Sequence, residues 1–162
     1  MPIDPQDLAD WFDAHAPAMI LYARQWVTLP AAEDIVQDIF LRAAAQGRRL
    51  ENPRAWLLAC TRNAAIDALR HRQREQDRQR DLSNRPLFAS HPGAAINDAE
   101  AQALLARLGP QEREIITLRI WAESNFEEIA DILNIPLSTV YHRYRAALVE
   151  LRDRLEEPCQ KK

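Results

Sequence analysis

Glycine is scarce in this chain, and that scarcity restricts the fold more than any other feature. Only 3 of the 162 residues are glycine, whereas 10 are proline. A sheet protein needs many tight turns, and glycine supplies their left-handed backbone conformations. The chain is rich instead in good helix formers such as Ala, Leu, Arg, Glu and Gln. We therefore expect an all-α protein with almost no strand.

Apolar side chains recur at three- and four-residue steps along the first half of the chain, which indicates amphipathic helices. One stripe runs from Leu8 to Trp26, but Pro17 interrupts it. Proline is tolerated in the first turn of a helix and not in its interior, so Pro17 is expected to start a second helix. The next helix ends near Gly47 and has five apolar residues on its inner face: Ile35, Val36, Ile39, Phe40 and Ala43.

A long helix is expected to start at Asn52-Pro53, an N-cap residue followed by proline in the first turn. It continues into an arginine-rich end and completes a bundle of three or four helices, the first domain at 1–78. From 79 to 98 prolines, serines and asparagines replace the helical pattern, which predicts a flexible linker. A second small bundle should follow at 99–157, with a tail at 158–162.

The second domain has the pattern of a helix-turn-helix. A helix from 99 to 108 stops at Gly109-Pro110, and another follows. Ser124 and Glu127 resemble a capping box that starts a short helix at 126–133. After a break at 134–136, a last helix runs from 137 to 156, and its apolar residues are expected to face inward: Val140, Tyr144, Leu148, Leu151 and Leu155.

The first half of this last helix carries polar and cationic side chains that are expected to face outward. They are Ser138, Thr139, Tyr141, His142, Arg143 and Arg145. A recognition helix presents such side chains to base edges and phosphates. A helical hairpin that packs against a partner protein is the alternative, but it has no need of this polar and cationic pattern. We therefore favour DNA binding.

Charges are segregated along the chain, although the formal net charge is only −3. Residues 1–40 carry seven acidic side chains against Arg24 alone, whereas residues 52–80 carry seven arginines against three acids. All of the 21 basic residues except Lys161 and Lys162 are arginine, which suits bidentate contacts to phosphate or guanine. The pattern indicates separate acidic and DNA-binding surfaces.

Several classes of protein are disfavoured by the motifs that the chain lacks. It has no catalytic Ser/His/Asp or Cys/His set and no phosphate-binding glycine loop, so we do not expect an enzyme. Cys60 and Cys159 are isolated, so neither a metal nor a cofactor is expected. The chain has no secretory leader pattern and no apolar run of about 18 residues, which predicts a cytoplasmic protein.

Three motifs follow one another along the chain. The first is the segment 32–40, and the second contains Trp56-Leu57, Arg62-Asn63 and Ile66-Asp67 ahead of a basic helix end. The third combines 108–113 with the helix-turn-helix residues 128–130, Thr139-Val140 and Arg143. In this order the motifs resemble those of bacterial extracytoplasmic-function (ECF, group 4) sigma factors, in the sigma-70 family, and the resemblance covers nearly the whole chain.

This resemblance implies an RNA polymerase sigma factor that binds promoter DNA through both domains. The first domain would hold the melted −10 strand with cations and hydrogen-bonding side chains: Arg48, Arg49, Arg62, Asn63, Asp67, Arg70, His71, Arg72 and Arg74. The second would read the −35 duplex with the six polar residues of the last helix and with Arg119. For Asn63 and Asp67 the alternative is a helix cap or a mutual side-chain hydrogen bond, and for Arg119 an ion pair with Glu123.

The resemblance also implies protein partners. Glu33, Asp34, Gln37, Asp38 and Phe40 would bind core RNA polymerase at the clamp helices of its β′ subunit. The last domain would meet the β flap, and an anti-sigma factor is a candidate inhibitor. Departures from the family pattern at Tyr141, Ala146 and Pro136 predict unusual −35 recognition.

Two other functions stay open on the sequence. A sigma-like decoy would sequester an anti-sigma factor without binding DNA, but it would have no reason to keep the arginines of both domains. A dimeric helix-turn-helix repressor would need a self-complementary interface.

Overall fold

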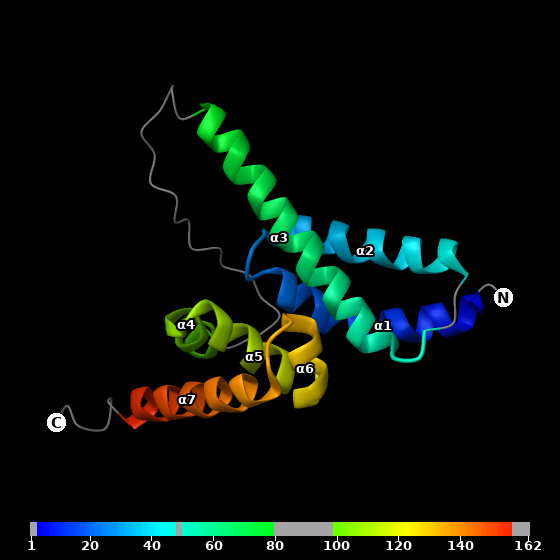
Figure 1. Ribbon diagram of the computed structural model, residues 1–162. Coiled ribbons are helices and arrows are strands. Elements are labelled where there is room, and N and C mark those ends of the chain that lie inside the picture. The colour runs from blue at the N-terminus through cyan, green and yellow to red at the C-terminus, as the bar shows by residue number, and fades with distance from the viewer. Residues whose placement is uncertain (1–2, 48–49, 80–98, 157–162) are drawn as a thin grey trace. The chain divides into compact units, whose positions relative to one another are not determined.

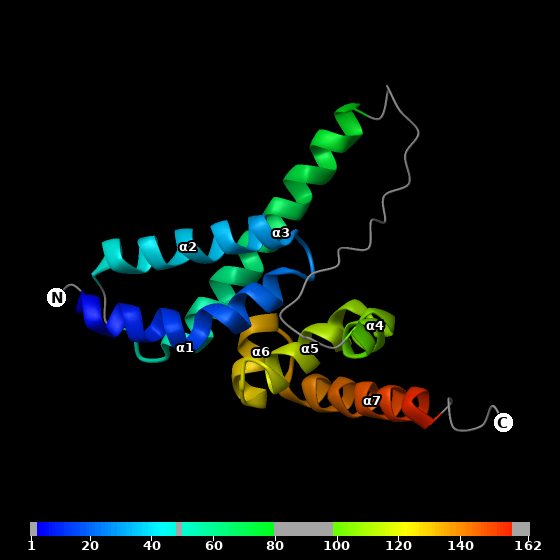
Figure 2. The ribbon, with the colours of Figure 1, turned by 180° about the vertical axis from the view of Figure 1, so that it is seen from behind.

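A computed structural model describes residues 3–47, 50–79 and 99–156, and within them every regular element is an α-helix. The chain divides into two compact units, Met1–Ala94 and Ala95–Lys162. The described residues form three helices in the first unit and four in the second, and Figures 1 and 2 show how the chain runs through them. The all-α prediction is confirmed. The predicted linker falls almost wholly outside the described residues.

The N-terminal unit contains α1 (Pro5–Ala23), α2 (Leu29–Gln46) and α3 (Pro53–Gln79), and α1 packs against both of the others. Local signals define their ends. The Asn52 side chain accepts a hydrogen bond from the Ala55 N–H at 3.2 Å, as an N-cap does. Gly47 follows α2 with φ of 57°, a left-handed conformation that suits glycine. Both ends match the predictions.

The core of this unit is formed by large side chains from all three helices. Met19 and Tyr22 of α1 are fully buried, as is Leu57 of α3. The Phe12 and Phe40 rings meet edge to face, with centroids 5.0 Å apart, and join α1 to α2. Beyond this core, α3 continues as an exposed, arginine-rich rod (Figure 1).

Pro17 corrects one prediction, because it lies inside α1 and does not start a new helix. Ala16, Met19, Tyr22 and Ala23 on both sides of it are buried. Burying this continuous stripe outweighs the local cost of an interior proline, and Pro17 itself faces solvent.

The C-terminal unit contains α4 (Ala99–Arg107), α5 (Pro110–Ile120), α6 (Phe126–Leu133) and α7 (Leu137–Glu156). Arg113 of α5 ties α4 in place, because its guanidinium donates to the carbonyl oxygens of Leu105, Ala106 and Leu108. The helices α6 and α7 form the predicted helix-turn-helix. Asn134 ends α6 in the left-handed conformation, with φ of 52°.

The capping box is one residue later than predicted. Asn125, and not Ser124, is the N-cap of α6: its side chain accepts from the Glu128 N–H at 2.7 Å, while Glu128 accepts from the Asn125 N–H at 2.9 Å. Ser124 is fully buried in the preceding turn. Both pairs have the capping-box spacing, and the turn that packs Ser124 inward selects the second.

The inner face of α7 also differs from the prediction at two residues. Val140 and Ala147 are buried, and Tyr144 and Leu151 pack against the core, but Leu148 and Leu155 are largely exposed. A helix turns 100° per residue, so Ala147 returns to within about 20° of Val140, whereas Leu148 lies about 80° away. The buried line therefore follows steps of four, three and four residues.

Candidate nucleic-acid interface

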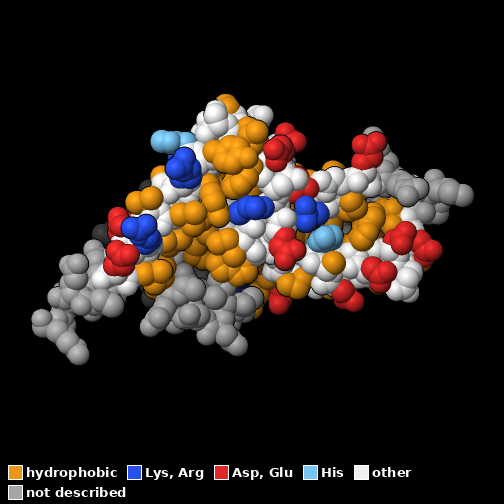
Figure 3. All heavy atoms as spheres, turned by 90° about the horizontal axis from the view of Figure 1, so that it is seen from below, with side chains coloured by type: hydrophobic (Ala, Val, Ile, Leu, Met, Phe, Trp, Pro, Cys, Tyr) orange, Lys and Arg blue, Asp and Glu red, His pale blue; other side chains and the backbone are white. Residues whose placement is uncertain are grey.

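Acidic and basic side chains are concentrated on different elements in the described part of the chain, although α3 and α7 also carry acidic residues. Four aspartates of the α1 segment are exposed, at positions 4, 7, 10 and 13. Figure 3 shows several acidic side chains toward the right of the view. Exposed arginines instead follow one another along the end of α3, and Arg145 is exposed in the first half of α7. Phosphates would be attracted to those two elements and repelled by α1.

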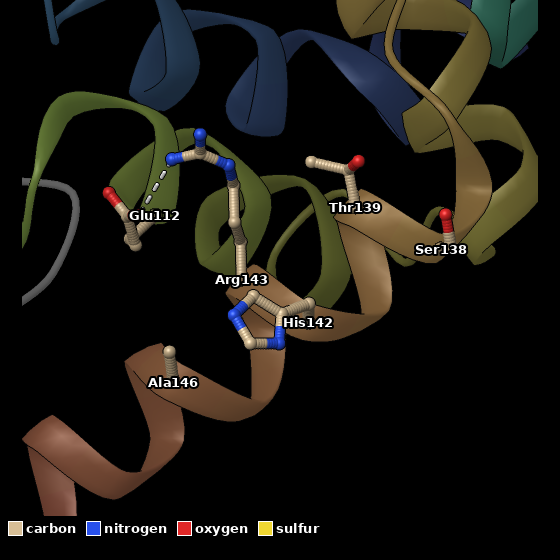
Figure 4. Close-up of a pocket in the computed structure, with 6 residues that line it drawn as sticks. All are labelled: Glu112, Ser138, Thr139, His142, Arg143 and Ala146. Carbon is tan, nitrogen blue, oxygen red and sulfur yellow. Dashed lines mark hydrogen bonds and ion pairs between the residues drawn. The ribbon is translucent and has the colours of Figure 1, made fainter.

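Four of the six predicted recognition residues on α7 gather at one hollow in the surface. Ser138, Tyr141, His142 and Arg145 are exposed, while Thr139 and Arg143 are half-buried. Ser138, Thr139, His142 and Arg143 line an open hollow of about 510 Å³, together with Ala146 and with Glu112 of α5 (Figure 4). Hydroxyl, imidazole and guanidinium groups thus converge on one surface of the helix-turn-helix.

Arg143 is held at this hollow by an ion pair. Its Nη1 lies 3.0 Å from Glu112 Oε1, and the two side chains are 39% and 23% exposed. The bond joins α7 to α5 across 31 residues of sequence. The guanidinium that was predicted to contact DNA is therefore also a link between two helices.

Tyr141 and Arg119 belong to an aromatic group that joins α5, α6 and α7. The Phe126 ring lies 4.5 Å from that of Tyr141 and 5.1 Å from that of Tyr144, measured between centroids. Arg119 stacks over Phe126 at 4.7 Å and donates to the Ser124 carbonyl oxygen at 3.1 Å. These contacts, and not an ion pair with Glu123, hold the Arg119 side chain.

On α3, Asn63, Asp67, Arg70 and Arg74 follow one another at three- and four-residue steps, and all are exposed. These steps place them along one face of the helix. The Asp67 carboxylate lies 3.9 Å from the Arg70 guanidinium, a weak pair at this exposure. His71 and Arg72 are also exposed, Arg62 is half-buried, and the predicted residues Arg48 and Arg49 lie outside the described residues.

The polar stripe of α2 is exposed as predicted, with one exception. Glu33, Asp34, Gln37 and Asp38 face solvent. Phe40, predicted as a polymerase-binding residue, is only 5% exposed and packs on Phe12, so its ring is not available to a partner. Its alternative assignment to the inner face of the helix is confirmed, because a ring of this size gains most by burial.

Comparison with known proteins places this surface in a family. Residues 11–75 match the family model Sigma-70 region 2, and residues 104–153 match Sigma-70, region 4. CarQ of Myxococcus xanthus, an RNA polymerase sigma factor, is 32% identical over 91% of this chain and 88% of its own length. The ECF sigma factor SigL of Mycobacterium tuberculosis is 31% identical over 90% and 87%.

This chain belongs to the sigma-70 family, as an ECF sigma factor. A solved structure of the sigma factor RpoE in complex with the anti-sigma factor NepR, from Bartonella quintana, is similar in fold, with a TM-score of 0.72 and 25% identity. It covers 93% of this chain and 98% of that one. The resemblance seen in the sequence is confirmed, and the family consists of transcription initiation factors.

The region matches of this sigma factor correspond to its two helical units. The region 2 match begins in α1 and ends in α3, and the region 4 match runs from α4 into α7. Among the described residues no group of three His, Cys, Asp or Glu side chains could hold a metal ion. A search of the same residues found no helix both long and apolar enough to cross a membrane.

Sequence reasoning missed two side chains at these surfaces. Glu112 lines the hollow on the helix-turn-helix, and the only signal for it was an acidic residue at the start of a helix. Leu41 is 69% exposed on α2, one helical turn beyond Gln37 of the polar stripe. Its signal was an apolar residue outside the inner stripe of that helix.

Proposed function

We propose that this sigma factor directs core RNA polymerase to its promoters through two DNA-reading surfaces and is not itself an enzyme. The observation that carries the proposal is the helix-turn-helix whose second helix, α7, presents Ser138, His142 and Arg145 to solvent. Such a helix reads base edges in the major groove of duplex DNA. We assign this surface, with Thr139, Tyr141, Arg143 and Arg119, to the −35 element.

The second surface is the exposed face of α3, which we assign to the melted −10 strand. Single-stranded DNA needs cations along its backbone and hydrogen-bonding groups for its exposed bases. Arg70 and Arg74 supply the first, and Asn63 and Asp67 the second, with Arg62, His71 and Arg72 beside them. Because all seven come from one helix, a rigid scaffold sets their spacing.

The polar stripe of α2 is the proposed contact to the polymerase β′ clamp, and the C-terminal unit the contact to the β flap. Glu33, Asp34, Gln37 and Asp38 are exposed on one helix, an arrangement that suits a basic or polar surface of the partner. In this proposal the domains are 1–78 and 99–157, with 79–98 as linker, and the protein acts in the cytoplasm. An anti-sigma factor is a candidate partner, because the similar RpoE was crystallised with one.

Run-off transcription tests the proposal directly. Purified core polymerase would transcribe a library of promoter fragments with and without this protein. Protein-dependent transcripts that share upstream sequences are the expected result and would define the −10 and −35 elements. A folded protein that binds polymerase but gives no transcript would favour the decoy, which keeps protein partners without reading DNA.

Two sets of variants separate the surfaces. Asn63→Ala with Asp67→Ala should reduce open-complex formation at least about tenfold, the effect of losing a base contact, and should leave polymerase binding unchanged. Asp34→Ala with Asp38→Ala should instead weaken polymerase binding. Asp7→Ala with Asp10→Ala removes the same charge from α1 and is the matched control.

A further inference from the structure

Glu112 is the one acidic side chain among the described residues that line the hollow on the helix-turn-helix. The other lining residues are neutral, can donate hydrogen bonds, or are positively charged. A carboxylate at a surface that meets DNA repels phosphates and so weakens binding. The carboxylate must therefore have another role at this surface that offsets the repulsion.

The carboxylate of Glu112 restrains Arg143. Glu112 Oε1 accepts from Arg143 Nη1 at 3.0 Å, and the glutamate is only 23% exposed. An arginine has five N–H donors, and this bond uses one of them. In Figure 4 the other guanidinium nitrogens of Arg143 point away from Glu112. The side chain is thus fixed in one direction, with most of its donors still available to a ligand.

Gly109 makes room for this arrangement. It is the N-cap of α5, and Glu112 folds back so that its Oε2 fills the place where a Cβ at position 109 would lie. The backbone of Gly109, with φ of −56° and ψ of 155°, is open to other residues. A side chain at this position would therefore displace the flexible end of Glu112 and not the backbone.

We propose that Glu112 is a positioning residue for −35 recognition: it holds Arg143 ready for one base pair and limits its contact with phosphates elsewhere. The inference rests on the proposed function of α7. Fixing a flexible side chain before binding removes an entropic cost of binding. Guanine is the base that a fixed guanidinium fits best, through its O6 and N7 acceptors. Glu112 thereby raises the specificity of −35 recognition and lowers the affinity for DNA that carries no promoter.

The test uses holoenzyme made from core polymerase and the full chain. A duplex library randomised upstream of a common transcribed region would be selected for binding, and the bound DNA sequenced. Affinity for a fixed duplex without a promoter would be measured at the same salt concentration. Three variants are compared with the wild type: Glu112→Ala, Glu112→Gln and Gly109→Ala. Asp131→Ala, an exposed acid on α6, is the matched charge control.

Glu112→Ala should lose about tenfold of the preference at one base pair, keep the preference at the others, and bind the non-promoter duplex more tightly. Glu112→Gln should keep the preference, because its amide oxygen can accept the same hydrogen bond. Gly109→Ala should behave like Glu112→Ala although it retains the carboxylate. Asp131→Ala should raise non-promoter affinity without changing any base preference.

Three outcomes would overturn the inference. The first is that Glu112→Ala selects the same DNA sequence as the wild type. The second is that Glu112→Ala loses base preference equally at every position of the DNA, as a merely structural role would cause. If Glu112→Ala does not fold, the Gly109→Ala variant tests the inference in its place. The third outcome is that Gly109→Ala then selects the same DNA sequence as the wild type. A wild-type holoenzyme that enriches no upstream sequence would instead overturn the proposed function itself, and this inference with it.

Discussion

Ser124 and Asn125 are adjacent in the turn before α6, and their side chains have different surroundings. Asn125 caps the helix by a reciprocal pair of bonds with Glu128. The Ser124 side chain is fully buried, and its hydroxyl has no hydrogen-bond partner among the described residues. A buried hydroxyl without a partner costs free energy, whereas a cap satisfies N–H groups that the helix leaves open.

Substitution by alanine should therefore have opposite consequences at these two residues. Ser124→Ala is expected to leave the free energy of unfolding unchanged or to raise it by up to about 1 kcal/mol. Asn125→Ala should lower it by about 1 kcal/mol, because the capping bonds are lost. Urea unfolding of the full chain measures both. Equal destabilisation by the two variants would show that the Ser124 hydroxyl is hydrogen-bonded after all.

His15 of α1 should make the N-terminal unit less stable in mild acid. Burial, and then the positive charge of Arg54, lower the pKa of His15 below its usual 6.5. As the pH falls below about 6.5, the unfolded chain binds a proton at His15 that the folded chain resists, so stability is lost. The unfolding midpoint should therefore fall less between pH 7.5 and 5.5 in His15→Gln than in the wild type. His71→Gln, at an exposed site, is the control, and an equal fall in all three proteins would contradict the prediction.

At the scale of whole elements, α1 shows how tertiary packing overrides a local signal. A proline inside a helix removes one backbone hydrogen bond and clashes with the preceding turn. The helix nevertheless continues through Pro17, because its buried residues belong to one unbroken stripe. The helix-turn-helix shows the opposite case. There α6 and α7 begin and end where the sequence predicts, although the N-cap is Asn125 and the buried line of α7 leaves out Leu148 and Leu155.

Replacing the interior proline should stabilise the N-terminal unit. Pro17→Ala restores the missing N–H in an exposed position of α1 and is expected to raise the free energy of unfolding by about 1–3 kcal/mol. Pro5→Ala is the matched control, because Pro5 stands in the first turn of the same helix, where proline fits. Thermal unfolding compares the stability of the two variants. An equal gain in stability in both would contradict the prediction that only the interior proline is unfavourable.

At the scale of the whole molecule, the arrangement of charge matters more than its sum. The formal net charge of −3 opposes DNA binding, while α3 and α7 each present arginines to solvent. The acidic side chains of α1 repel phosphates over distances of about 10 Å at ordinary salt. A chain built in this way has little attraction for DNA in general and depends on its polymerase partner to be brought to a promoter.

The free protein should therefore bind promoter duplex weakly. At about 0.15 M salt we expect a dissociation constant in the range of non-specific complexes, roughly 1–100 μM, and much tighter binding by the holoenzyme. Replacing Asp7, Asp10 and Asp13 by asparagine should strengthen DNA binding by the free chain. Titration of labelled duplex measures both effects. A tight, sequence-specific complex without polymerase would contradict the prediction.

The sequence by itself determined the all-α class, most of the helix ends, the helix-turn-helix and the family. Caps, helix breaks and apolar periodicity depend on residues that are close together in the sequence. The same periodicity largely predicted which residues of α3 and α7 are exposed. Only the tertiary structure decided that Phe40 belongs to the core and not to the polymerase-binding stripe, that α1 continues through Pro17, and that Glu112 holds Arg143. These three depend on which helices pack together and at what distance. The bond between residues 112 and 143 exists because α5 and α7 meet in the fold, and neither residue's neighbours in the sequence carry that information.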